Sequence, residues 1–296
     1  MKFKLFKKKF LLTTLVITTF VSFSAVSVSC NIDSHFKKEI TSQESKSVDN
    51  KIGKKLNQEI TIKKYKEDDK SKIIDVKTTY WQKFGYIEGT VIKVFDGDTY
   101  LLEYEKDGEK KQVKIRCWGL DTPETRSPNV PNVSEIEQKY SDLDTEHAKS
   151  LILNQKVRTI LLHQQTYDRE VGITFFGKNF EECFEYRMLK DGYTLPRFTK
   201  ENIESWKLEF NKKQKDSIAS LFLKDFAYAT NYAVLKRLGF YKDFKTPEEL
   251  QRKVFLSHGD VISTFMFLPS LLENGYYVEA EDNIFLFLDK HKTNNK

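Results

Sequence analysis

Two strand-like segments, each leading into a run of acidic residues, constrain the fold of this chain more than any other feature. The first covers residues 90–95 and gives way to Asp-Gly-Asp-Thr at residues 96–99. The second covers residues 113–118 and leads into Asp-Thr-Pro-Glu at residues 121–124. An Asp-Gly pair at residues 107–108 lies between them, and such a pair predicts a hairpin turn. The sequence therefore predicts two strands with acidic groups at their ends and a hairpin turn between them.

Three carboxylates, those of Asp98, Asp121 and Glu124, fall at strand ends or just past them. Rigid β-structure can hold side chains that loops alone would leave mobile. Oxygen ligands that converge at one end of a sheet suit a divalent cation such as Ca²⁺. Arg116 lies five residues before Asp121 on the second strand, so a cation site and a guanidinium could face one phosphate group.

Each motif also has a purely structural interpretation. An Asp-Gly pair is a common hairpin turn. Residues 121–124 could simply begin a helix, with a capping oxygen, proline at the first helical position and an acid in the first turn. In this order and at this spacing, however, the motifs together favour a functional site.

Both motifs resemble those of the staphylococcal (micrococcal) nuclease family, also called thermonucleases. The family pattern is Asp-Gly-Asp-Thr followed by Arg-Leu-x-Gly-Ile-Asp-x-Pro-Glu, and residues 96–99 and 116–124 depart from it only at Cys117 and Leu120, which stay apolar. The resemblance is dense up to residue 124 and thinner from there to about residue 241. It implies an α+β fold, an OB-fold five-stranded β-barrel with flanking helices, to which this chain adds a C-terminal extension.

The resemblance also implies Ca²⁺-dependent chemistry and a role for each matching residue. Asp98, Asp121 and the backbone carbonyl of Thr122 would hold Ca²⁺, which polarises a phosphate oxygen. Glu124 would orient or deprotonate the attacking water. Arg116 would stabilise the extra negative charge of five-coordinate phosphorus.

A second arginine matches the family further along the chain. In the family segment Asp-x-Tyr-Gly-Arg, the arginine is the second phosphate clamp and the tyrosine contacts the nucleotide; Arg169 and Tyr167 occupy these positions. Gln165 replaces the aspartate, and Asp168 replaces the glycine. If the glycine position needs a positive φ, Asp tolerates it better than most residues. Asp168 could also pair with Arg169, which leaves a surface ion pair open as an alternative role for this arginine.

The N-terminus has the layout of a secretion signal. Five lysines precede an uncharged stretch over residues 10–29, and small residues precede Cys30, as is typical of a cleaved signal. The stretch is also long enough to serve as an uncleaved membrane anchor. Residues 27–30, Ser-Val-Ser-Cys, resemble a bacterial lipobox. This implies removal of residues 1–29 and lipid modification of Cys30, which would hold the chain at the extracellular face of the cell membrane.

Charge and composition divide the rest of the chain. Of the net charge of +6, the five N-terminal lysines supply all but +1, so the total charge does not by itself indicate a nucleic-acid partner. Residues 31–75 are polar with almost no aromatic side chains, which predicts a flexible tether. We expect a lipid-anchored linker over residues 30–78, a nuclease-like domain over 79–243 and an extra packed extension over 244–296.

Further elements follow from hydrophobic periodicity within the expected domain. Residues 126–143 carry prolines and no sustained apolar period, which predicts a loop beside the acidic turn. The remaining predicted strands cover residues 99–104, 157–162 and 171–176, and the predicted helices begin near residue 144 and cover 184–189 and 217–238. Cys117 and Cys183 could pair, although two buried free thiols are favoured.

The family resemblance and the N-terminal signal together imply an extracellular, membrane-anchored, Ca²⁺-dependent nuclease. It would hydrolyse DNA and RNA to 3′-phosphorylated products for nucleotide scavenging, act as a monomer, and show little sequence specificity because base stacking tolerates any base. One alternative is a protein with a nuclease-like fold that binds nucleic acid or a surface without cutting. Another is a lipoprotein whose function lies in the C-terminal extension.

Overall fold

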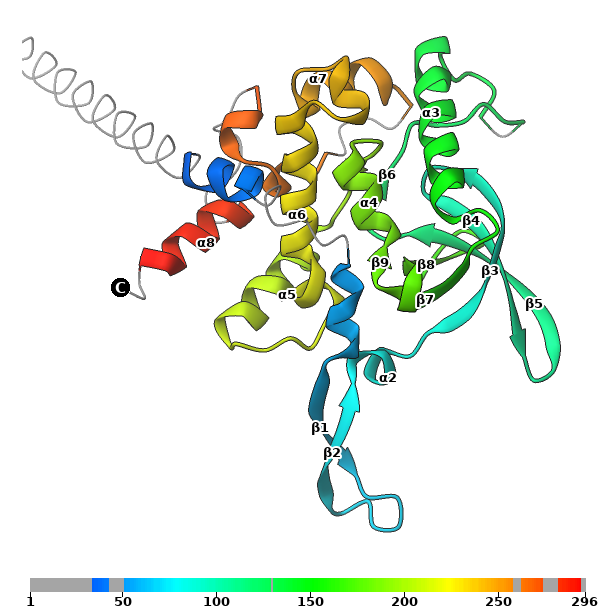
Figure 1. Cartoon of the computed structure of the whole chain (residues 1–296), viewed down its shortest axis with the longest axis vertical. Helices are drawn as coiled ribbons and strands as arrows, with labels where there is room; N and C mark the ends of the chain where they lie inside the picture. Colours follow the sequence, from blue (N-terminus) through cyan, green and yellow to red (C-terminus); the bar gives the residue numbers. More distant parts are fainter. Residues whose placement is uncertain (1–33, 43–50, 129, 258–261, 274–281, 294–296) are drawn as a thin grey trace, which may run out of the picture.

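The computed structural model describes residues 34–42, 51–128, 130–257, 262–273 and 282–293 (Figure 1). The expected signal peptide and the expected lipidation site, Cys30, lie outside these ranges. Within the ranges, no helix combines the length and the apolar character that crossing a membrane requires.

A closed five-stranded β-barrel carries the two acidic motifs. Its strands are β3 (Ile87–Asp96), β4 (Thr99–Lys106), β5 (Glu109–Cys117), β7 (Lys156–Thr166) and β8 (Arg169–Phe176). Four neighbouring pairs are antiparallel, and a parallel pairing of β5 with β8 closes the barrel. This mixed barrel confirms the OB-fold that the sequence predicted.

Alternation along the strands places one set of side chains inside the barrel. In β4, Tyr100 and Leu102 are buried, as their alternation with Leu101 predicts. A tyrosine hydroxyl inside a core needs a hydrogen-bond partner. The Tyr100 hydroxyl has two, because the hydroxyls of Thr159 in β7 and Thr174 in β8 lie 2.8 and 2.7 Å away. This bonding ties three strands together inside the barrel.

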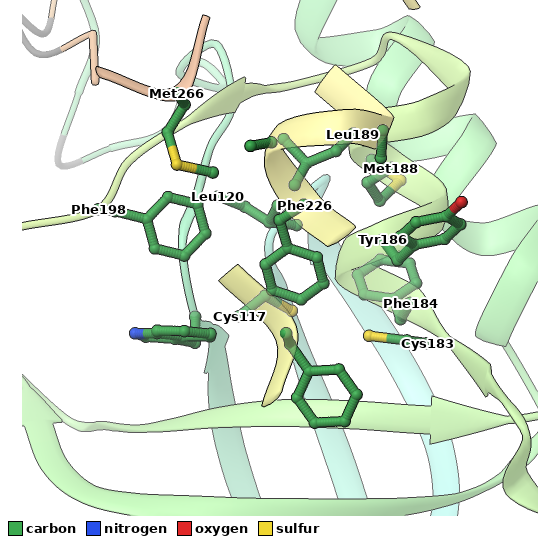
Figure 2. Close-up of a cluster of buried hydrophobic side chains, with 14 of the residues drawn as sticks. Cys117, Leu120, Cys183, Phe184, Tyr186, Met188, Leu189, Phe198, Phe226 and Met266 are labelled. Carbon is green, nitrogen blue, oxygen red and sulfur yellow. The ribbon is translucent and has the colours of Figure 1, made fainter. Parts of the chain in front are cut away.

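Helices cover one side of the barrel (Figure 1). The long helix α6 (Ile218–Lys236) contacts both α4 (Phe184–Asp191) and α5 (Lys200–Asn211), while α4 also contacts β8. Figure 2 shows Phe226 of α6 among buried side chains that come from the barrel, from α4 and from the C-terminal extension. The hydrophobic core therefore continues from the barrel into the helices.

The predicted loop over residues 126–143 is wrong in its second half. Helix α3 (Glu135–Ile152) begins at Glu135, where the Ser134 hydroxyl accepts the N–H of Glu137 at 3.1 Å. The buried positions of its first turns are Glu137, Tyr140 and Ser141. Because two of these three are polar, the sequence hides the period of the buried face.

The expectation of a flexible tether is also wrong for part of its range. The described elements there are a helical segment over 34–42, η1 (Ile52–Asn57), β1 (Glu59–Tyr65) and β2 (Ile73–Thr79). Phe36 and Ile40, one helical turn apart, are both buried, as is Leu56 of η1. A few well-spaced apolar residues therefore pack this polar segment onto the larger domain. The average composition of the segment does not reveal this packing.

The described part of the C-terminal extension packs onto α6. The side chain of Asn231 in α6 donates to the carbonyl of Met266 at 2.8 Å and accepts the N–H of Leu268 at 2.7 Å. These buried bonds satisfy backbone groups that would otherwise be costly to bury. The elements of the extension are α7 (Pro247–Val254), η4 (Thr264–Met266), η5 (Pro269–Leu271) and α8 (Ile284–Thr293). Shorter elements elsewhere are α2 (Tyr80–Phe84), β6 (Leu120–Asp121), η2 (Lys178–Phe180), β9 (Glu182–Cys183), β10 (Leu195–Pro196) and η3 (Gly239–Lys242).

The buried carboxyl of Glu185 makes the stability of this fold depend on pH. Both of its oxygens accept the backbone N–H of Thr174, and Cys183, a free thiol like Cys117, donates to it at 3.3 Å. Burial raises the pKa of Glu185 from 4.5 to about 8. The folded state therefore keeps a proton that the unfolded state releases, so the free energy of unfolding falls as pH rises through this interval.

We expect Glu185→Gln to reduce that pH dependence between about pH 5 and 8, because glutamine does not titrate. Urea unfolding at several pH values would measure it. Glu135→Gln, at an exposed position, should keep the slope of the parent protein. An unchanged slope in Glu185→Gln would show that this carboxyl does not control the effect.

Candidate active site

The turn between β3 and β4 places Asp98 at one end of the barrel. The Asp96 carboxylate accepts the N–H of Asp98 at 3.1 Å and closes the turn. A Cβ atom added to Gly97 would lie 2.6 Å from an Oδ atom of Asp144 in α3. The glycine is therefore needed for close approach to α3, and the turn directs Asp98 into a buried position.

Arg116 connects Asp98 to Asp121. It lies near the end of β5, opposite Thr99 in β4. Its Nη1 is 2.7 Å from Asp98 Oδ1, and its Nη2 is 3.4 Å from Asp121 Oδ1. Both aspartates are buried, and the Arg116 side chain is only 18% exposed. The structure thus brings together three of the residues that the sequence singled out.

Asp98 is electrostatically unusual. Burial raises its pKa to about 8, although the Arg116 guanidinium acts in the opposite direction. The neighbouring carboxylates of Asp96 and Asp121 raise it further. Its Oδ2 atom is buried and has no hydrogen-bond partner among the described residues. Since an unpartnered buried carboxylate oxygen is costly, this atom marks a position where a cation or a proton would be stabilised.

Long-range contacts fix the position of Asp121. Strand β6 pairs with β10, so that Asp121 lies opposite Leu195. The Thr194 hydroxyl donates to the Asp121 carbonyl at 2.8 Å. Arg197, which sequence reasoning missed, places Nη1 2.8 Å from Asp121 Oδ1. Thr122 is buried directly after Asp121.

Asp144 is a second buried carboxyl that sequence reasoning missed. It is fully buried in α3, and its Oδ2 has no hydrogen-bond partner within the described part of the chain. Burial, together with the charges of Asp96 and Asp98, raises its pKa well above the usual value. Asp144 lies next to the Asp-Gly-Asp turn only because α3 packs against this turn, and the sequence does not show that packing.

Glu124 lies partly buried at the start of the segment after β6. Its N–H donates to Oε1 of Glu137 in α3 at 3.4 Å. The buried Glu137 carboxylate also accepts the hydroxyl of Ser257 at 2.8 Å. A residue of the C-terminal extension is therefore linked, through one carboxylate, to the backbone of the acidic turn.

The second family-like segment forms a tight turn between β7 and β8. The left-handed conformation falls on Tyr167, with φ of 59°, rather than on Asp168. The Asp168 carboxylate pairs with Lys114 Nζ at 3.3 Å, whereas Arg169 Nη1 lies 3.4 Å from the hydroxyl of Thr99. Arg169 is thus directed toward the turn that carries Asp98, and the Tyr167 side chain is 92% exposed.

Several of the residues described above line one pocket with a volume of about 490 Å³. Its lining includes Arg116, Glu124, Tyr167, Arg169 and Arg197. Three guanidinium groups beside one carboxylate make it suited to phosphate. The lining comes from β5, the β6 segment, the β7–β8 turn and the β10 segment, so only the folded domain assembles it.

The buried acids that contact Arg116 offer some, but not all, of the ligands that a divalent cation needs. Within the described ranges no group of three or more His, Cys, Asp or Glu side chains is arranged to hold a metal. Two carboxylates do meet at Arg116, and the unpartnered Oδ2 of Asp98 is an available oxygen ligand. Ca²⁺ and Mg²⁺ commonly complete their coordination with backbone carbonyls and water.

The closed barrel and its pocket of acids and arginines define a nuclease-like domain of the OB-fold type. Comparison with known proteins agrees, because residues 114–218 match the family model of staphylococcal nuclease homologues. The match includes Arg116, Asp121, Glu124 and Arg169, whereas Asp98 lies before it. This part of the chain is therefore similar to the staphylococcal nuclease homologues.

Three relatives show the range of this similarity. A thermonuclease of Staphylococcus hyicus is 37% identical over 38% of this chain and 60% of its own length. A thermonuclease of Staphylococcus intermedius is 29% identical over 43% of this chain and 69% of its own. An uncharacterized lipoprotein of Mycoplasma genitalium is 37% identical over 34% of this chain and 41% of its own. The chain thus spans about half the length of the lipoprotein and the first thermonuclease.

Removing Arg116 should leave two buried carboxylates without their shared partner. We expect Arg116→Met to lower the free energy of unfolding by about 3 kcal/mol near pH 8, since breaking a buried ion pair leaves a buried charge without its partner. Urea unfolding would measure the loss. Lys114→Met is the matched control on the same strand, because its pair with the exposed Asp168 should contribute only about 0–1 kcal/mol. Equal effects of the two substitutions would contradict the buried bridge.

Proposed function

We propose that this protein is an extracellular, membrane-anchored nuclease that hydrolyses phosphodiester bonds of DNA and RNA in a Ca²⁺-dependent reaction with 3′-phosphorylated products. The observation that carries the proposal is the Arg116 bridge between Asp98 and Asp121 beside a pocket that Glu124 and Arg169 also line. The names of the two thermonuclease relatives support a nuclease activity.

Asp98, Asp121 and the Thr122 carbonyl would hold Ca²⁺ in this proposal. When bound, the ion would polarise a phosphate oxygen and offset its charge. Glu124 would orient the attacking water or take its proton, a role that needs a carboxylate within hydrogen-bond reach. Its place in the lining of the pocket supports this role.

Arg116 and Arg169 would stabilise negative charge on the phosphorus group as it becomes five-coordinate. Their guanidiniums approach the pocket from β5 and from the β7–β8 turn. Loss of one such preorganised donor commonly costs about 10² to 10³ in rate. The exposed ring of Tyr167 would stack on a base, which gives affinity without sequence preference.

The lipobox-like residues 27–30 support attachment through a lipid on Cys30. The lipoprotein name of the Mycoplasma genitalium relative favours the same topology. A nuclease held outside the cell as a monomer would suit the degradation of environmental nucleic acid for nucleotide uptake. Unchanged growth of a deletion strain on polymeric DNA as the nucleotide source would count against that role.

A cleavage assay separates this proposal from a binding protein without catalysis. The protein would be incubated with labelled DNA and RNA in Ca²⁺ and, in parallel, with a chelator. We expect fragments bearing 3′-phosphates only when Ca²⁺ is present. Binding without cleavage in Ca²⁺ would favour the non-catalytic alternative.

Glu124→Gln should retain DNA binding and lose most cleavage, by about 10² or more, because the amide cannot accept the proton of water. Fluorescence anisotropy would measure binding, and single-turnover kinetics would measure cleavage. Glu135→Gln removes an exposed carboxylate from the beginning of α3 and should behave like the parent protein. Full activity of Glu124→Gln would remove this carboxylate from the mechanism.

Ser257→Ala should impair catalysis from a distance. It removes the 2.8 Å bond to Glu137, which supports the N–H of Glu124. We expect kcat to fall by about 10-fold with KM unchanged, because small displacements of a catalytic group are costly. Ser150→Ala, which removes an exposed hydroxyl on α3, is the control. A kcat equal to that of the control would show that the C-terminal extension does not position this turn.

A further inference from the structure

We propose that Arg197 binds a second phosphate of the substrate strand, next to the phosphate that reacts. This inference rests on the proposed nuclease function and specifies its substrate, a strand with at least two consecutive phosphodiester groups. The residue lies in the segment after β10, outside the motifs that pointed to the active site.

Arg197 reaches the same carboxylate oxygen as Arg116. Its Nη1 is 2.8 Å from Asp121 Oδ1, and Arg116 Nη2 is 3.4 Å from that atom. The two guanidinium nitrogens are therefore within about 6 Å of each other, close enough to contact neighbouring groups on one strand. They approach Asp121 from different elements of the fold.

The two arginines differ in solvent exposure, and this difference assigns them to different phosphates of the strand. The Arg197 side chain is 49% exposed, against 18% for Arg116. A guanidinium has five N–H donors, and among the described residues the guanidinium of Arg197 pairs only with Asp121. Donors thus remain on the outer side, where the residue lines the pocket. Arg116 would face the reacting phosphate, and Arg197 the one further out.

The backbone that carries Arg197 is held firmly. The Arg197 N–H donates to the carbonyl of Gly119 at 2.9 Å. The Ser263 hydroxyl accepts the N–H of Phe198 at 2.7 Å and donates to its carbonyl at 3.0 Å. The Phe198 ring packs edge-on against Trp118, with ring centroids 4.9 Å apart, and lies in the buried cluster of Figure 2. A binding group on a fixed backbone loses little freedom when a ligand arrives.

The pocket also holds more guanidinium groups than one phosphodiester requires. Its lining includes three guanidiniums, those of Arg116, Arg169 and Arg197, and one carboxylate, Glu124. A phosphodiester carries a single negative charge, whereas a strand adds one charge with each nucleotide. The competing explanation is that Arg197 only neutralises Asp121, in which case its loss would not depend on substrate length.

Substrate length therefore tests the proposal. Binding of thymidine dinucleotide and tetranucleotide would be measured by competition on the Glu124→Gln protein without divalent cations, which excludes cleavage. We expect Arg197→Ala to weaken tetranucleotide binding about 10-fold and to lower the salt dependence by about 0.7 in the log–log slope, as loss of one phosphate contact predicts. Dinucleotide binding should not change, and Arg197→Lys should recover part of the loss. Arg252→Ala, which removes an exposed arginine of α7, is the control.

Three outcomes would overturn the proposal. Equal losses for both oligonucleotides would place Arg197 at the reacting phosphate or at Asp121 alone. No loss relative to Arg252→Ala would leave it without a role in binding. If the parent protein neither binds the tetranucleotide nor cleaves it in Ca²⁺, the proposed function fails and this inference fails with it. If the parent protein cleaves the tetranucleotide and Arg197→Ala cleaves it equally well, only the second-phosphate contact is ruled out.

Discussion

One guanidinium held between two buried carboxylates is the interaction on which the candidate site depends. Arg116 contacts Asp98 on one side and Asp121 on the other. The two acids would repel each other in a low-dielectric interior without it. The β4–β5 register places Arg116 opposite Thr99, beside Asp98, and the β6–β10 pairing holds Asp121. These two strand pairings thus bring two motifs that are separated in the sequence into one site.

The C-terminal extension contributes more than additional core. Ser263 fixes the backbone next to Arg197, and Ser257 supports the acidic turn through Glu137. The two supported backbone segments carry Arg197 and Glu124, whose side chains line the same pocket. Residues beyond the region that matches the family model therefore support the backbone beside the pocket.

The sequence predicted individual strands because alternating apolar residues and turn signals are local, as in the segments that became β3, β4 and β5, whereas the barrel itself was implied by the family resemblance. It also predicted which acids and arginines would converge, because a family motif preserves their spacing. It did not predict the first half of α3, where Glu137 and Ser141 occupy buried positions. Arg197 and Asp144 reach the site only through pairing between distant segments, which no local pattern encodes.

Calorimetric titration of the protein with Ca²⁺ tests most directly whether the buried acids form a cation site. The account predicts one binding event in the parent protein and its loss in Asp98→Asn, because the amide presents only one weaker oxygen ligand. An Asp142→Asn control, at an exposed position of α3, should bind as the parent does. Absence of binding in the parent, or equal binding after Asp98→Asn, would contradict the account.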